Sequence, residues 1–200
     1  MRFNYLRILT FLALSFPFIA LLFAGFSNQL GPDPAKVLAE ESGEWALMIL
    51  LLTLAATPLA RVIKMPWPVR LRRMLGLFAF FYVVIHLLVY LWLFSGFDLA
   101  TIVGDLTERP YIIVGFIAFL LMVPLAVTST HKMRRRLRNN WSRLHKAIYL
   151  VGGLALVHVL WQVRSDLTEA IVYVVSFCIL MLARCYYWYL QSRGSQKTSQ

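Results

Sequence analysis

The sequence has little charge, few acidic residues and only two cysteines. Of its 200 residues 14% are charged, and nine are Asp or Glu against twenty Lys or Arg. No acid lies in the middle of a long apolar run, which argues against a typical proton-coupled transporter built on membrane carboxylates. Cys178 and Cys185 form neither a C-x-x-C motif nor a Cys/His zinc spacing. Their separation along one helix is too large for an ordinary disulfide, so we expect them to serve in packing.

Motifs of soluble enzymes are also missing. The sequence contains no P-loop, no G-x-G-x-x-G fingerprint and no G-x-S-x-G nucleophile elbow. The chain therefore lacks a recognisable nucleotide-binding domain of its own.

What the sequence has in abundance is apolar residues. They make up 60% of the chain, and the mean hydropathy is +0.69, which is too apolar for an ordinary soluble domain. Runs of transmembrane length predict an all-α integral membrane protein with a six-transmembrane-helix bundle. We expect one membrane domain at 1–192 and a disordered cytoplasmic tail at 193–200. The predicted spans are 6–26, 44–60, 75–95, 111–129, 146–163 and 168–190.

The first apolar run has two interpretations, because Arg2 and Arg7 flank it as they would flank a signal peptide. The run is long for the apolar region of such a peptide, and no A-x-A cleavage site follows it. We therefore favour a first span that is not cleaved.

The distribution of charge predicts the orientation of the bundle. The net charge is +11, and most Lys and Arg fall at the two termini and in the loops on the same side as the termini. All nine acids fall in the opposite loops, at 27–44, 95–110 and 164–169. The positive-inside rule then places both termini in the cytoplasm and the chain in a bacterial inner membrane as a multi-pass protein. For the basic run at 131–143, contact with anionic lipid is the favoured interpretation over nucleic-acid binding, since no nucleic-acid-binding fold accompanies it.

Two histidines lie inside the apolar runs, and they are the candidate cofactor ligands. His86 lies in FFYVVIHLLVYLWLF and His158 in YLVGGLALVHVLWQV. An imidazole in hydrocarbon needs a partner, and each alone is most simply a hydrogen-bonded core residue. Both fall in the outer half of spans that run in the same direction, however, at similar depth. This match favours axial ligation of one haem between the third and fifth spans.

Other candidates lie at the inner edge. The interval from His145 to His158 is about 20 Å of helix, so His145 falls at the cytoplasmic edge. A second haem there would need a histidine on the third span near Arg72 and Arg73. With His145 and Trp141, these arginines suit a flavin phosphate or haem propionates. His131 in the basic loop is expected to be solvated.

Several segments resemble one family in order and spacing. The sequence is similar to the MsrQ (YedZ) family of the ferric-reductase-like transmembrane domain superfamily, over about residues 25–165. The segments that carry the resemblance are GPDPAK, ATPLAR, RLRRMLGLFAFFYVVIHL, TERPYIIVG, LAVTST and WSRLHKAIYLVGGLALVHVLW.

The resemblance implies a transmembrane electron-transfer cytochrome b with haem b and FMN as cofactors. Members pass electrons from the quinone pool or a cytosolic flavin reductase to MsrP, a periplasmic molybdopterin enzyme that reduces methionine sulfoxide in oxidised proteins. By resemblance, His86 and His158 match the outer haem ligands, and His145 matches the inner-side histidine. The superfamily has a fourth haem histidine that this chain lacks. The number of haems thus stays open.

The interpretation we favour is an electron-transfer subunit that has no substrate pocket of its own. One alternative is a stand-alone ferric or oxygen reductase, although no flavin/nicotinamide domain is fused to the chain. Another is a membrane protein without redox function, in which the histidines only pack.

Overall fold

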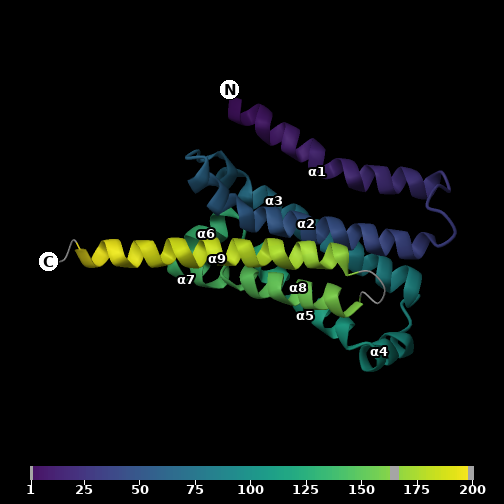
Figure 1. Cartoon of the computed structure of the whole chain (residues 1–200). Coiled ribbons are helices and arrows are strands. Elements are labelled where there is room, and N and C mark those ends of the chain that lie inside the picture. Colours follow the sequence, from purple (N-terminus) through teal and green to yellow (C-terminus); the bar gives the residue numbers. More distant parts are fainter. Residues whose placement is uncertain (1, 163–166, 198–200) are drawn as a thin grey trace.

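The chain folds into helices that cross the molecule from end to end. The computed structural model describes residues 2–162 and 167–197, and within those ranges every regular element is a helix (Figure 1). The long helices are α1 (Arg2–Phe26), α2 (Pro34–Val62), α3 (Trp67–Val89), α5 (Pro110–Val127), α8 (Ala147–Gln162) and α9 (Thr168–Lys197). A π-helical turn η1 (Tyr90–Phe94) extends α3, and short helices α4 (Leu99–Glu108), α6 (His131–Leu137) and α7 (Asn139–Leu144) fill the connections.

The predicted six-helix membrane bundle is confirmed. Six segments are long and apolar enough to cross a membrane, and each overlaps one predicted span: Asn4–Phe26, Pro34–Val62, Trp67–Phe94, Pro110–Val127, Asn139–Gln162 and Thr168–Leu190. The second and third begin earlier than predicted, because the residues that start these helices lie outside the apolar runs: Asp33 and Pro34 for α2, and Pro68 for α3. Asp33 accepts a hydrogen bond from the backbone N–H of Lys36 and caps α2, with Pro34 in its first turn.

The connections predicted as loops contain three short helices. Asp98 caps α4 by accepting hydrogen bonds from the Thr101 hydroxyl and from the backbone N–H groups of Thr101 and Ala100. These bonds, led by the one from the Thr101 side chain, hold the pKa of the Asp98 carboxyl below its ordinary value.

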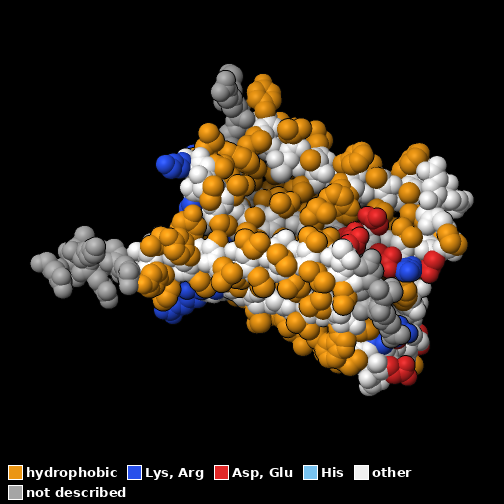
Figure 2. Space-filling view, in the orientation of Figure 1, with side chains coloured by type: hydrophobic (Ala, Val, Ile, Leu, Met, Phe, Trp, Pro, Cys, Tyr) orange, Lys and Arg blue, Asp and Glu red, His pale blue; other side chains and the backbone are white. Residues whose placement is uncertain are grey.

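Helices adjacent in space form two main pairs. α2 packs along α3, and α5 packs along α8, while α3 also meets α5 and α9 lies against α2 and α8. The described ends of α1 and α9 lie at the same end of the bundle (Figure 1). Figure 2 shows Lys and Arg gathered at that end and most Asp and Glu at the other, with hydrophobic side chains between. The charge separation read from the sequence is therefore present in three dimensions.

Two further expectations concern α9. Cys178 and Cys185 are exposed on this helix, so the expectation that they serve in packing finds no support within the described bundle. The surface of α9 between its ends is broad and apolar, and such positions face lipid. Helix α9 continues to Lys197, into the segment 193–200 predicted as a tail, and 198–200 lie outside the described residues. The domain boundary at 192 stays a prediction.

A buried hydroxyl joins α1 to α3 at a proline. Pro17 lies inside α1, where its ring disturbs the helical hydrogen bonds and bends the helix (Figure 1). The Tyr82 hydroxyl enters this gap, donating to the Leu14 carbonyl at 2.7 Å and accepting from the Phe18 N–H at 3.1 Å. Tyr82 is fully buried, one helical turn before His86. One side chain thus replaces the backbone bond that normally joins residues 14 and 18.

Tyr82→Phe is expected to loosen α1, because it removes both hydrogen bonds and keeps the ring. Hydrogen bonds between membrane helices contribute about 1 kcal/mol each, so the loss should be about 1–2 kcal/mol. A lowered Tm in detergent would show it. Tyr5→Phe, which removes an exposed hydroxyl from α1 itself, is the matched control. Equal Tm values for the two variants would contradict the bridging role of Tyr82.

Candidate functional site

His86 on α3 and His158 on α8 face each other inside the bundle. Their ring centroids lie 6.2 Å apart, and the ring planes are nearly perpendicular, at 87°. Both side chains are half-buried. The two histidines selected from the sequence by their depth therefore form a pair.

Each histidine is oriented by a backbone carbonyl of the neighbouring helix. His86 Nδ1 lies 2.9 Å from the Ala39 carbonyl oxygen on α2, and His158 Nδ1 lies 2.7 Å from the Tyr111 carbonyl oxygen on α5. A carbonyl only accepts, so Nδ1 carries the proton in both rings. The lone pair then sits on Nε2, which is the arrangement that a metal-binding histidine needs.

Two glycines make room for the histidine rings. Gly43 lies one turn after Ala39, and a Cβ there would come within 3.2 Å of His86 Nδ1 and Cε1. Gly115 lies one turn after Tyr111, and a Cβ there would come within 2.7 Å of His158 Nδ1. The same device, a carbonyl followed one turn later by a glycine, thus holds each ring.

The sequence analysis missed these supporting residues. The available signal was a glycine inside each apolar helix, since glycine weakens a helix and often marks a close approach. Nothing in the sequence identified the carbonyls of Ala39 and Tyr111, because every helical residue carries one.

The spacing of the pair fits a haem iron. Imidazole nitrogens bind transition metals at about 2 Å, so two ligands on opposite sides of one iron place their ring centroids about 6 Å apart. The observed separation of 6.2 Å agrees with that value. Within the described residues, no group of three or more His, Cys, Asp or Glu side chains is placed to hold a bare metal ion. The residues present thus fit a haem, and His86 and His158 are the side chains that would hold its iron.

His145 has different surroundings. Its ring stacks on Trp141 with centroids 4.1 Å apart, and its Nε2 lies 3.0 Å from Thr128 Oγ1. Thr128 Oγ1 donates its proton to the Pro124 carbonyl at 2.6 Å, so it accepts from Nε2–H of His145. In this arrangement Nε2 is occupied. Ligation of a haem by His145 stays a prediction.

Arg72 and Arg73 diverge on α3. Arg72 is half-buried and lies within electrostatic range of both His145 and Arg184. Arg73 is exposed. The structure thus places Arg72 near His145 at the basic end. A role for the two arginines in binding flavin or haem propionates stays a prediction. His131 begins α6 and is exposed, as expected of a solvated histidine.

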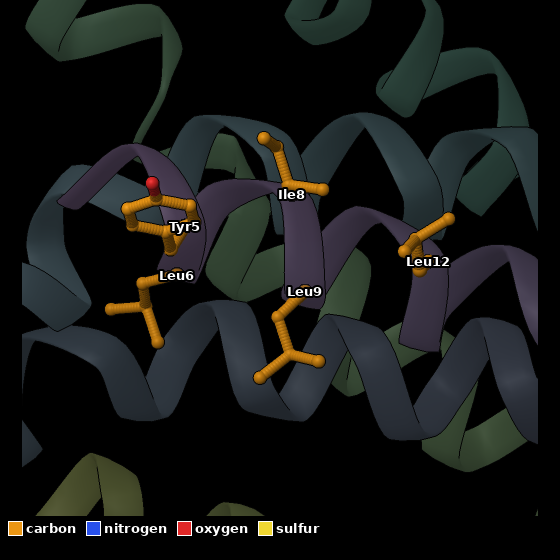
Figure 3. Close-up of a pocket in the computed structure, with 5 residues that line it drawn as sticks. All are labelled: Tyr5, Leu6, Ile8, Leu9 and Leu12. Atoms are coloured by element: carbon orange, nitrogen blue, oxygen red, sulfur yellow. The ribbon is translucent and has the colours of Figure 1, made fainter. Parts of the chain in front are cut away.

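An apolar hollow on α1 is unrelated to this site. Its cavity of about 450 Å³ is lined by α1 side chains alone, and the Tyr5 hydroxyl is the only polar group on them (Figure 3). None of the predicted site residues reaches it, and most of its lining is exposed. Its chemistry is that of a lipid-facing surface. The lining residues are Tyr5, Leu6, Ile8, Leu9 and Leu12.

Comparison with known proteins identifies the class of membrane protein to which the chain belongs. Residues 42–156, from α2 to α8, match the family described as "Ferric reductase like transmembrane component". Both facing histidines lie on helices within or continuous with this match. The bundle and its histidine pair therefore define a ferric-reductase-like membrane protein. No solved structure matches the chain.

Similar proteins identify the family within that class. A protein of Polaromonas naphthalenivorans is 43% identical over 176 residues, covering 86% of this chain and 80% of its own length. A protein of Xanthomonas campestris pv. campestris is 48% identical over 155 residues, covering 78% and 71%. A protein of Herminiimonas arsenicoxydans is 38% identical over 192 residues, covering 94% and 88%. Each is named protein-methionine-sulfoxide reductase heme-binding subunit MsrQ. The chain belongs to the MsrQ family.

Proposed function

We propose that this chain is a haem b-binding cytochrome subunit that passes electrons across the bacterial inner membrane to a periplasmic protein-methionine-sulfoxide reductase of the MsrP type. The observation that carries the proposal is the pairing of His86 and His158 at a separation that suits two axial ligands of one iron. The relatives' shared name, which states both haem binding and the reductase system, supports it.

Each part of the site has a definite task in this proposal. His86 and His158 would hold the iron through Nε2, and the carbonyls of Ala39 and Tyr111 fix the orientation of the two rings. Haem, when bound, supplies the one-electron iron couple that lets an electron pass through hydrocarbon. The apolar residues of the surrounding helices exclude water and keep the local dielectric low.

The two ends of the bundle have complementary tasks. We place the basic end, with both termini, in the cytoplasm because of the positive-inside rule. The acidic end then faces the periplasm and offers a surface to the molybdopterin reductase. The electron donor at the basic end is a cytosolic flavin reductase or the quinone pool.

A flavin is the second cofactor of the proposal. We place the FMN phosphate, or a haem propionate, near Arg72 at the basic end, with the exposed Arg73 beside it. Arg72 is half-buried and within electrostatic range of His145, which supports a site for an anionic group at this place. His145 contributes its imidazole there, either stacked on Trp141 as described or turned to an inner haem.

The proposal is tested by following haem oxidation without oxygen. The purified protein is reduced to completion, and its haem spectrum is recorded after addition of the periplasmic reductase with methionine sulfoxide. We expect the haem to reoxidise, and to stay reduced when methionine replaces the sulfoxide. Haem that stays reduced with methionine sulfoxide would contradict the proposal.

The family description keeps one alternative in view, since it names ferric reductase. A stand-alone ferric or oxygen reductase would reoxidise with a ferric chelate or oxygen at a rate that sustains turnover, with no need for the periplasmic enzyme. Rapid turnover with these acceptors together with no response to the reductase would establish that alternative.

A further inference from the structure

A cavity with two arginines in a mainly apolar wall opens between α2, α8 and α9 at the basic end of the bundle. Its volume is about 460 Å³, and its walls combine guanidinium groups with aromatic and apolar side chains. It contains none of the haem or flavin residues predicted from the sequence. The lining includes Thr57, Arg61, Tyr149, Met181, Arg184 and Trp188.

Arg184 on α9 is fixed in this cavity by a proline on α2. Pro58 has no N–H, so the carbonyl of Leu54 cannot make its normal helical bond. Arg184 Nη2 donates to this carbonyl at 2.7 Å, and Nη1 donates to the Tyr149 hydroxyl at 2.6 Å. The guanidinium therefore has a defined position, and its remaining edge carries the Nε–H.

Two buried polar groups in the lining have no hydrogen-bond partner among the described residues. They are Arg184 Nε and Thr57 Oγ1. An unsatisfied buried donor is strongly unfavourable, and more so when it belongs to a charged group. Both atoms are buried in residues that line the cavity, and a small rotation of either side chain would turn its donor toward an oxygen-rich ligand there.

The cavity also has an excess of positive charge. Arg61 lines it and stacks on the Tyr187 ring at 4.9 Å, and both Arg61 and Arg72 lie within electrostatic range of Arg184. Among the described residues, no Asp or Glu lines this cavity. Glu169 is about 22 Å from Arg184 along α9, from the helical rise alone. Guanidinium groups within electrostatic range of one another, with no carboxylate in the lining, favour the binding of an anion.

We propose that this cavity binds the phosphate group of an anionic phospholipid of the adjacent leaflet. Arginine presents forked donors that match phosphate oxygens. Trp188 is 73% exposed at the rim, and tryptophan concentrates at the headgroup level of membranes. Met181 and Pro58 supply an apolar wall for the glycerol and acyl groups. The lipid would complete the contact of α9 with α2, independently of whether haem is bound.

Native mass spectrometry of the full-length purified protein tests this site. The probes are phosphatidylglycerol, FMN and inorganic phosphate, each added to delipidated protein in detergent. The test variants are Thr57→Val, which removes the unpartnered hydroxyl with little change in shape, and Arg61→Gln. Neither variant disturbs the Arg184 bonds to α2 and α8. Arg136→Gln, which removes an exposed charge from α6, is the matched control.

Wild-type protein and Arg136→Gln are expected to retain one phosphatidylglycerol tightly. Thr57→Val and Arg61→Gln should each bind it about tenfold more weakly, as expected for loss of a charge-assisted hydrogen bond or a charge. In delipidated protein, Thr57→Val should match or exceed the wild-type Tm, because an unsatisfied hydroxyl has been removed.

Two outcomes would overturn the proposal. One is phosphatidylglycerol binding that is unchanged in both test variants, with Thr57→Val more stable than wild type whether lipid is present or not. The other is loss of FMN or inorganic phosphate, but not of lipid, from the same variants. That second result would assign the phosphate site to a soluble ligand.

Discussion

Replacing either His86 or His158 by alanine is expected to remove most of the low-spin haem spectrum. A six-coordinate iron loses one of its two axial ligands in either variant, and no other imidazole is placed to substitute. On the turns next to His86, the hydroxyls of Tyr82 and Tyr90 are already bound to Leu14 and Asp105. His145 lies before the start of α8, at the other end of the bundle. The two variants should therefore have closely similar defects.

The measurement is the absorption spectrum of purified protein after reduction, normalised to protein content. His131→Ala is the control, because it removes an exposed imidazole from the basic end and should leave the spectrum unchanged. His145→Ala separates one haem from two: a partial loss would indicate that a second haem depends on it. An unchanged spectrum in both His86→Ala and His158→Ala would refute the assignment of the ligands.

Gly115→Ala is expected to reduce haem binding although it touches no metal. A Cβ at this position would lie 2.7 Å from His158 Nδ1 and 2.8 Å from Cε1, which is too close for the ring to stay in place. The ring would have to move away from the Tyr111 carbonyl that fixes it. Loss of such an orienting bond typically lowers metal affinity by about tenfold or more.

Gly43→Ala provides a graded comparison. The corresponding distance to His86 is 3.2 Å, so a shift of a few tenths of an ångström accommodates the methyl group and the effect should be smaller. Gly153→Ala on α8 is the control, since nothing lies within 4 Å of its added Cβ. Haem titration of the three purified variants checks the order. If Gly115→Ala binds haem as well as Gly153→Ala, the glycine does not protect the ring.

The sequence predicted the features that depend on composition and on how deep a residue lies in its membrane span. Long apolar runs predicted the six spans, because only a helix satisfies its backbone in hydrocarbon. The depths of His86 and His158 on parallel helices predicted that they would meet. The starts of α2 and α3 were less predictable, since capping residues such as Asp33 lie outside the apolar signal.

Features that depend on which helices touch were beyond the sequence. The Ala39 and Tyr111 carbonyls become partners of histidines only because α2 lies beside α3 and α5 beside α8. The contact of His145 with Thr128 depends on how the hydroxyl is turned at the end of α5. Arg184 is one of many Lys and Arg residues in the chain, and nothing in the sequence singles it out. Its role follows from the carbonyl that Pro58 leaves free one helix away.

The Tyr82 hydroxyl in the gap at Pro17 also limits how α1 can slide along α3. Apolar helices in lipid can shift along one another at little expense, because one hydrocarbon contact replaces another. A hydrogen bond to a single backbone gap has only one position along the axis. Although α1 is largely exposed, its height relative to α3 is therefore defined by one atom, one turn from His86. A largely exposed helix is thereby kept in register with the helix that carries His86.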